Sequence, residues 1–125
     1  MKIALIITAS TLSIFATSAS AQNMPVSTFL AKADALKAKG PLALFSSDIG
    51  VLKKEVEAAA VSYRGDRKAA QTAGQKPEVC PPDKFKLNSD DMLASFRAIP
   101  VAERPRTNVK QAWVMMMKQR FPCPK

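Results

Sequence analysis

Two cysteines are the residues whose chemistry is best defined by type and spacing. Cys80 and Cys123 are the only cysteines among 125 residues, and the chain contains no histidine. Two thiols without histidine fall short of the four nitrogen or sulfur ligands of a structural zinc site. A redox-active pair usually has the spacing C-x-x-C, whereas 42 residues lie between these two. We therefore predict a structural disulfide between Cys80 and Cys123, with a redox pair as the alternative.

Other groupings that could carry catalysis or bind a metal are weak. The absence of histidine removes the commonest general base, and four scattered glycines form no phosphate-binding loop. Asp90 and Asp91 are adjacent, but successive helical positions diverge by about 100°, which favours a role at a helix start over catalysis. The same divergence separates Met115, Met116 and Met117, so core packing is favoured over Cu(I) binding. We predict a protein that is not an enzyme and that holds no cofactor and no metal.

The start of the chain has the pattern of a secretory signal peptide. Lys2 is followed by an apolar stretch over residues 3–16 and by an A-x-A site that ends at Ala21. Some 14 apolar residues are too few for a membrane anchor, which needs about 20. We predict a signal peptide over residues 1–21, cleaved after Ala21, and one domain over residues 22–125. The mature protein would lie in the periplasm or be secreted, where a disulfide is stable.

Helical spacing of apolar residues dominates the rest of the chain, and strand signals are weak. We expect four helices, over residues 28–39, 48–73, 90–99 and 108–120, with Ser27, Ser89 and Thr107 as the caps of the first, third and fourth. The third and fourth helices should form an antiparallel hairpin, which places Cys80 and Cys123 at its open end. The predicted fold class is all-α: a small four-helix domain with a disulfide-closed C-terminal helical hairpin.

Basic residues are concentrated in the C-terminal segment. Residues 97–125 contain seven lysines and arginines and one acidic residue, Glu103, out of a formal net charge of +9 for the chain. The fourth helix is also apolar nearly all round, which is typical of deep burial or of docking on a partner. A solvated face is the plain alternative. The candidate partner contacts are Arg104, Arg106, Lys110, Trp113, Val114, Met115 and Lys118.

The C-terminal half resembles a known family in its order of motifs. Cys80-Pro81-Pro82, a helix that ends in Ile99-Pro100, a polar turn, and a helix that closes on Arg120-Phe121-Pro122-Cys123 are similar to the Rap/Tai-type immunity proteins. Those are exported helical proteins that protect bacteria from peptidoglycan amidase effectors of type VI secretion. They resemble in turn the small periplasmic acid-stress chaperones. The match covers about residues 60–123, and it implies a bridging pair at Cys80 and Cys123 and a helix breaker at Pro100.

These observations predict a non-enzymatic, exported binding protein. The resemblance implies an immunity-type inhibitor of a cell-wall amidase effector or of a similar envelope partner. The alternatives are a periplasmic stress chaperone and a binder of an anionic envelope polymer or membrane surface. Nucleic acid is disfavoured as a partner, because aromatic residues are not interleaved with the basic ones. Stable membrane insertion is not expected. The oligomeric state is left open, with a dimer as one option.

Overall fold

The structure, a computed structural model, describes residues 24–125 and is all-α. The predicted signal peptide lies outside the described residues. In chain order the elements are α1 (Val26–Lys39), the 3-10 helix η1 (Gly40–Phe45), α2 (Ser47–Thr72), α3 (Ser89–Arg97) and α4 (Val109–Arg120). Four α-helices and no strand among the described residues confirm the predicted fold class.

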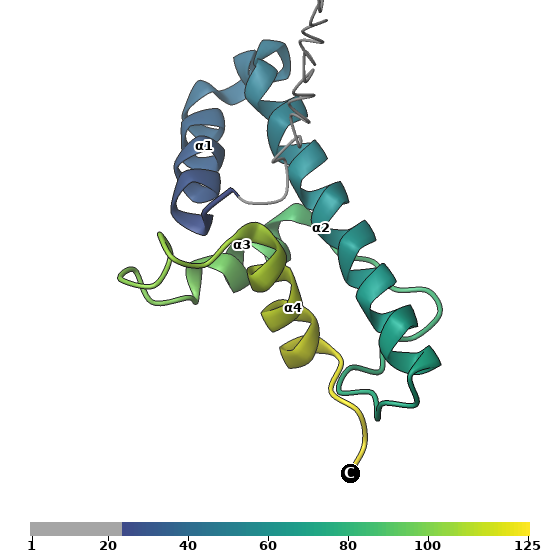
Figure 1. Cartoon of the computed structure of the whole chain (residues 1–125). Helices are drawn as coiled ribbons and strands as arrows, with labels where there is room; N and C mark the ends of the chain where they lie inside the picture. Colours follow the sequence, from purple (N-terminus) through teal and green to yellow (C-terminus); the bar gives the residue numbers. More distant parts are fainter. Residues whose placement is uncertain (1–23) are drawn as a thin grey trace, which may run out of the picture.

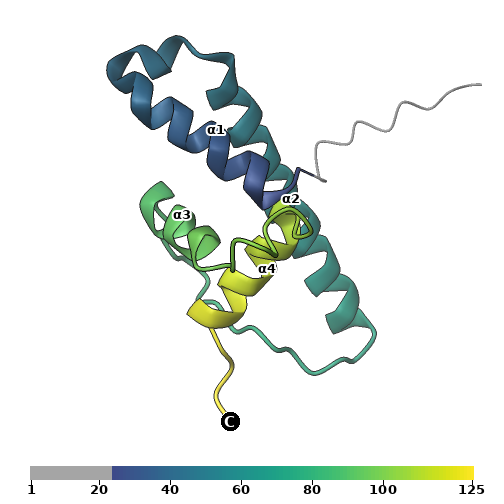
Figure 2. The same cartoon turned by 90° about the vertical axis from the view of Figure 1, so that its left-hand side faces the viewer.

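Two helical hairpins make up the fold. α1 and α2 run side by side and are joined by η1 at one end of the molecule, whereas the C-terminus lies at the opposite end (Figure 1). α4 packs chiefly on α2, and α3 contacts both α1 and α4. The view turned by 90° shows the second hairpin beneath the first, with α4 crossing the face of α2 (Figure 2).

The capping residues predicted for three helices differ from those in the structure. α3 and α4 are capped by Asn88 and Asn108, whose side chains accept the backbone N–H of Asp91 and Gln111, and not by Ser89 and Thr107. Either neighbour has a suitable side chain, and the extended backbone at the asparagines decides which one acts. Both helices begin within one residue of the prediction, and α3 ends two residues earlier than predicted.

The start of α1 has no side-chain cap, so the prediction of Ser27 as the cap is wrong. The backbone N–H of Val26 donates to the carbonyl of Thr107 at 2.8 Å, and that of Ser27 donates to Arg104 at 3.3 Å. Pro25 and Asn108 form an isolated antiparallel bridge at the same place. Carbonyls from a distant segment therefore satisfy the free donors that a capping side chain normally would.

The core is built from apolar side chains of all four α-helices, although Ile49, which periodicity predicts on the buried face of α2, is 36% exposed. Phe29 of α1 and Phe96 of α3 meet edge to face with ring centroids 5.5 Å apart. Trp113 and Met116 of α4 are buried, as is Tyr63 of α2. Periodicity did not identify three further buried side chains, those of Val26, Val79 and Met117. Burial of these residues stabilises the helices more than their own propensity does.

The disulfide is at the predicted place. Cys80 and Cys123 are bonded, with their Cα atoms 4.8 Å apart. Beside it, the N–H of Cys80 donates to the carbonyl of Phe121 at 2.8 Å, and Val79 forms an isolated bridge with Pro122. The segment that leads into α3 is thus fixed to the segment that follows α4. The disulfide closes the open end of the C-terminal hairpin, as the sequence predicts.

Candidate functional site

The basic C-terminal segment is largely compensated by acidic residues from elsewhere in the chain. Four of its seven cationic side chains form ion pairs: Arg97 with Asp34, Lys110 with Asp66, Lys118 with Glu78, and Arg120 with Asp91. The N···O distances of the first three are 2.6 Å. These pairs connect α3 to α1, α4 to α2, α4 to the 73–88 loop, and α4 to α3. The segment therefore fastens the helices together and does not present a bare positive face.

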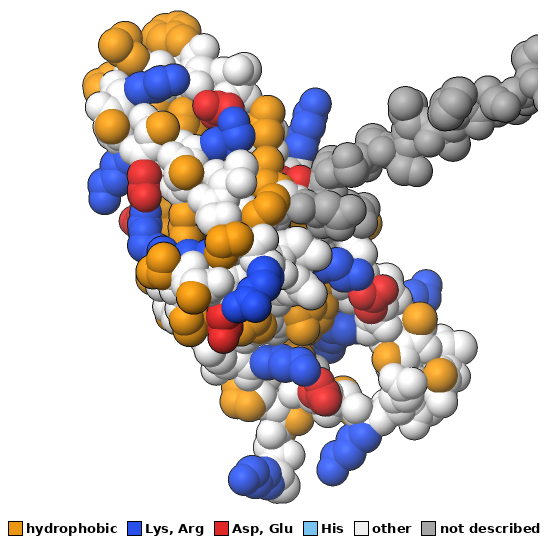
Figure 3. Space-filling model, turned by 60° about the vertical axis from the view of Figure 1, so that its left-hand side comes forward, with side chains coloured by type: hydrophobic (Ala, Val, Ile, Leu, Met, Phe, Trp, Pro, Cys, Tyr) orange, Lys and Arg blue, Asp and Glu red, His pale blue; other side chains and the backbone are white. Residues whose placement is uncertain are grey.

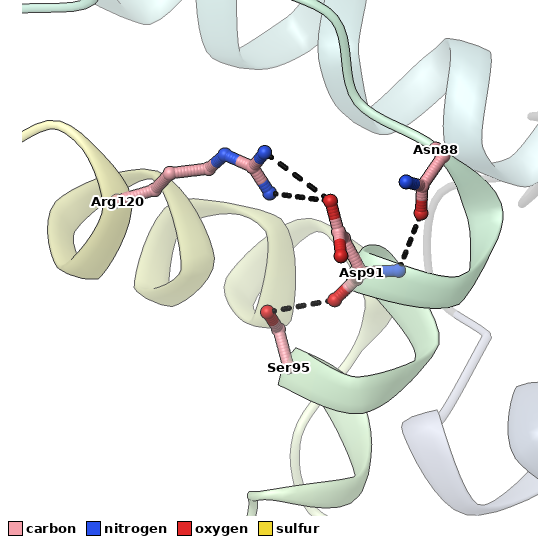
Figure 4. Close-up of polar contacts among 4 residues, drawn as sticks. All are labelled: Asn88, Asp91, Ser95 and Arg120. Carbon is pink, nitrogen blue, oxygen red and sulfur yellow. Dashed lines mark hydrogen bonds and ion pairs between the residues drawn. The ribbon is translucent and has the colours of Figure 1, made fainter.

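Asp91 shows how closely one of these pairs is built into the hairpin (Figure 4). Its N–H donates to Oδ1 of Asn88 at 2.7 Å, and its carbonyl accepts the hydroxyl of Ser95 at 3.0 Å. Its carboxylate accepts hydrogen bonds from both terminal nitrogens of Arg120. The geometry assigns Asp91 a structural role at the start of α3.

The other predicted contact residues lie in different surroundings. Arg104 donates to the carbonyls of Ile99 and Arg97, and so holds the turn after α3. Arg106 and Met115 are exposed, and Val114 is half-buried. Trp113 is buried in the core, so its side chain packs inside the protein and is not exposed for contact with a partner. The structure does not bring these seven residues together into one exposed patch.

A groove that the sequence analysis did not identify lies next to this segment. It has a volume of about 900 Å³ and runs between the C-terminal half of α2, the loop that follows it, and α4. Val114 and Lys118 are the two predicted contacts that line it. Residues 73–88, the loop that follows α2, form the opposite wall and follow no helical period, so residue spacing could not reveal the groove.

Cations line this groove in excess. Arg64, Arg67 and Lys68 lie at spacings of three and four along α2 and hence on one face, and Lys76 projects from the loop. None of these four forms an ion pair with a residue of the described chain. The two acids of the lining, Asp66 and Glu78, are held by Lys110 and Lys118. The groove is therefore suited to an anionic group.

One residue of the groove lining carries a buried hydroxyl. Tyr63 is 6% exposed, and its hydroxyl has no hydrogen-bond partner among the described residues. Burial raises its pKa above the usual value, against the opposing effect of Arg67, which lies over the ring at 5.7 Å. Because this hydroxyl is itself buried, it is an unpaired polar group of the packed interior beneath the groove lining and not an exposed donor.

The ion pairs also set the protonation of two carboxylates. A hydrogen bond from Lys118 lowers the pKa of Glu78, and a hydrogen bond from Lys32 at 2.9 Å lowers that of Asp48. Both groups remain anionic to a lower pH than usual, which keeps the salt bridges formed. Among residues 24–125 no cluster of three or more histidine, cysteine or acidic side chains is placed to hold a metal ion.

The helices of the described chain are also too short or too polar to cross a bilayer. Comparisons with protein-family models, with curated proteins and with solved structures found no match to this chain.

Proposed function

We propose that this protein is a non-enzymatic, exported binding protein that inhibits a cell-wall amidase effector or a similar envelope partner. The observation that carries the proposal is the basic groove between α2, the 73–88 loop and α4. Four of its cations form no ion pair with a described residue, whereas both acids of its lining are paired. An inhibitor of this kind would accept an acidic segment of its partner. Arginine side chains suit this role, because they bind carboxylates with two hydrogen bonds.

The spacing of the groove cations supports a binding role over a purely structural one. Arg64 and Lys68 are like charges four positions apart on one helix, an arrangement that weakens a helix slightly. Their side chains are exposed and line the groove. Anion binding would offset this repulsion, whereas a structural role leaves it uncompensated.

The disulfide supports the proposal by fixing one wall of the groove. Cys80 and Val79 line the groove, and both are tied to the segment after α4 by the covalent bond, a hydrogen bond and the isolated bridge. A wall that is held in place before binding loses less conformational freedom when a partner docks. The resemblance to the immunity proteins, which rests on the motifs around these cysteines, names the class of partner.

The test begins with capture from an envelope extract by the oxidised protein that starts at residue 22. We expect the captured protein to cleave purified peptidoglycan, and we expect equimolar addition of the present protein to stop that cleavage. The variant Arg64→Gln/Lys68→Gln should weaken the complex by about tenfold or more. The control variant Lys84→Gln/Lys86→Gln changes two exposed lysines outside the groove lining and should bind as wild type does.

The same assay tests the predicted contact residues outside the groove. Arg106→Ala and Met115→Ser alter exposed side chains, whereas substitution of Arg104 or Lys110 would also remove internal bonds. If the groove variants inhibit as wild type does and only Arg106→Ala loses inhibition, the contact lies on the turn before α4. Capture of a protein that has no effect on peptidoglycan would overturn the amidase assignment.

A periplasmic stress chaperone is the second candidate function. Ion pairs join every helix to another element, and each of them needs an ionised carboxylate. Strong acid would break these pairs together and loosen the packing between the helices. This candidate predicts suppression of client aggregation only below about pH 4, and a change in oligomeric state over the same range. A binder of anionic polymer would instead release its ligand steeply as salt is added.

A further inference from the structure

The tip of the α1–α2 hairpin carries a group of exposed apolar side chains. Leu42, Leu44 and Phe45 of η1 are 69%, 80% and 88% exposed, and Ile49 in the first turn of α2 is also exposed. No residue of η1 is buried. Single exposed leucines are common on proteins, but a contiguous apolar group of this kind marks an interaction site.

The geometry of η1 aligns two of these side chains, whereas Leu44 projects about 120° away from them. A 3-10 helix has three residues per turn, so Leu42 and Phe45 are aligned one above the other. The tip lies at the far end of the molecule from the C-terminus (Figure 1). The space-filling view shows apolar side chains covering this upper end, with cationic ones just below (Figure 3). The groove described above lies along the opposite half of α2.

Lysines surround the tip at its base. Lys37 and Lys39 lie in the last turn of α1, and Lys53 and Lys54 follow the first residue of α2 by six and seven positions, about 9–10 Å along the axis. Neither Lys37, Lys39 nor Lys54 forms an ion pair within residues 24–125.

The acids of the same region are paired with cations of this chain, including the exposed Glu57, which lies 4.0 Å from Lys53. Asp48 is paired with Lys32 at 2.9 Å, and Asp34 with Arg97 at 2.6 Å. The charge presented beside the apolar tip is therefore positive, although acidic residues are present in the local sequence.

We propose that this tip inserts into the interfacial region of a lipid bilayer that contains anionic phospholipid. Apolar side chains of surface-bound proteins reach about 5–10 Å below the head groups. At that depth Lys53 and Lys54, about 9–10 Å along α2 from its first residue, would lie near the lipid phosphates, with their aliphatic stems along the acyl boundary. Phe45 would be buried with the leucines at the acyl boundary, as phenylalanine is in other surface-bound segments. In this arrangement the protein is bound at the membrane surface and does not span the bilayer.

The shape and size of the tip favour a bilayer over a protein as the occupant. A stable protein interface uses about 20–30 residues on each side, and this tip offers four apolar side chains on a convex end. Two copies that met tip to tip across a two-fold axis would bury only these four side chains on each copy, far fewer than a stable interface uses. Fluid lipid adapts to a convex tip, and anionic head groups complement its lysines.

Sedimentation with vesicles tests the proposal. We expect wild-type protein to bind vesicles of phosphatidylcholine with about one third phosphatidylglycerol, and to bind pure phosphatidylcholine at least about tenfold more weakly. Leu44→Ser/Phe45→Ser should lose most of the binding to the mixed vesicles. The control Val61→Ser/Val101→Ser removes two similarly exposed apolar side chains away from the tip and should bind normally. Since all four side chains are exposed, each variant should fold, which circular dichroism checks.

The lysines have a matched pair of variants as well. Lys37→Gln/Lys39→Gln should weaken binding severalfold, whereas Lys84→Gln/Lys86→Gln, with the same change in net charge, should not. Equal losses in both pairs would overturn the proposal in favour of general attraction of a basic protein. Absence of binding to the mixed vesicles, or a dimer that the Leu44→Ser/Phe45→Ser variant abolishes, would also overturn it.

A spectroscopic measurement tests the depth of the tip directly. Trp113 is the only tryptophan and is buried, so its emission should not respond to lipid. In Phe45→Trp, the added indole should shift its emission to shorter wavelength when mixed vesicles are added. An unchanged spectrum at saturating lipid would mean that the tip does not enter the bilayer. This inference is independent of the proposed inhibitor function, since the two surfaces lie at opposite ends of α2.

Discussion

Both terminal nitrogens of Arg120 lie 3.2 Å from the same carboxylate oxygen, Oδ2 of Asp91. Arg120 is the last residue of α4, and Asp91 belongs to the first turn of α3. The pair therefore joins the two ends of the hairpin that the Cys80–Cys123 disulfide also closes. A covalent bond and an electrostatic contact restrain the same end of the molecule.

The Asp91–Arg120 pair should contribute only modestly to stability. The two side chains are 46% and 35% exposed, so water and salt screen their attraction. A double-mutant cycle with Asp91→Asn and Arg120→Gln should give a coupling energy of about 0.5 kcal/mol in urea denaturation at low salt. Repeating the cycle in about 1 M salt should reduce it towards zero. A coupling above about 2 kcal/mol would show that the pair is effectively desolvated.

Removal of the disulfide should have a much larger effect. The bond spans 43 positions, and its loss should cost up to about 4 kcal/mol by the chain-entropy argument. In a domain of about 100 residues a loss of that size would lower the thermal midpoint by up to roughly 20 °C. Calorimetry of Cys80→Ser/Cys123→Ser measures the loss. Reductant should lower the midpoint of the wild type and leave that of the variant unchanged; an equal effect on both would mean that reductant acts elsewhere.

Glu55 should make the protein less stable at neutral pH than an uncharged residue would. It is 3% exposed, and burial raises its pKa, while the hydrogen bond from the N–H of Met24 opposes the rise. A raised pKa in the folded state means that the contribution to stability is complete below the unfolded pKa of about 4.3 and is lost as pH rises through the folded value. Glu55→Gln keeps an acceptor for Met24 and should raise the thermal midpoint at about pH 7 but not below about pH 4.

Glu78 provides the opposite case in the same experiment. Its pKa is lowered by Lys118, so its contribution is present above the unfolded pKa and is lost as pH falls through the folded value. Glu78→Gln should therefore lower the midpoint slightly at neutral pH and match wild type in strong acid. A parallel pH dependence for Glu55→Gln, Glu78→Gln and wild type would contradict both assignments.

Two glycines inside or at the end of α2 should respond in opposite directions to alanine. Gly65 is helical and has no atom within 4 Å of where a Cβ would lie, so Gly65→Ala should stabilise by about 1 kcal/mol. Gly74 has a φ of 72°, a left-handed conformation that costs an L-residue about 1 kcal/mol or more. Urea denaturation should show a gain for Gly65→Ala and a loss for Gly74→Ala. Equal effects of the two substitutions would mean that the helix propensity of these positions does not affect the stability of the protein.

The helices and the disulfide could be predicted because their signals are local or few. Apolar residues recur at helical spacing, and two cysteines leave one pairing. The caps were displaced because Asn88 and Ser89 both suit the position, and backbone conformation decides between them. The lack of a side-chain cap on α1 could not be predicted, since its acceptors are carbonyls of residues 104 and 107.

Charge was the least predictable property of the candidate site. The C-terminal segment carries a large local excess of cations, but the acids that pair with it come from distant positions such as Asp34 and Asp66. Arg97 and Asp34 are 63 residues apart. The spacing of Arg64, Arg67 and Lys68 places three cations on one face of α2, but it does not by itself indicate a groove. The other wall of the groove is a loop, whose course depends on the disulfide and on the packing of α4.

The backbone bonds between residues 24–27 and 104–109 also constrain the order in which the chain can assemble. A polypeptide that emerges from the ribosome or from a translocation channel with its N-terminus first presents α1 early. The carbonyls that complete the start of α1 emerge only with the final quarter of the chain. If α1 and α2 form their hairpin early, the backbone donors at the start of α1 still lack their acceptors. The protein therefore reaches its native state only after nearly the whole chain has emerged. The folded protein should therefore form when the chain is released, and not when the first hairpin has been synthesised.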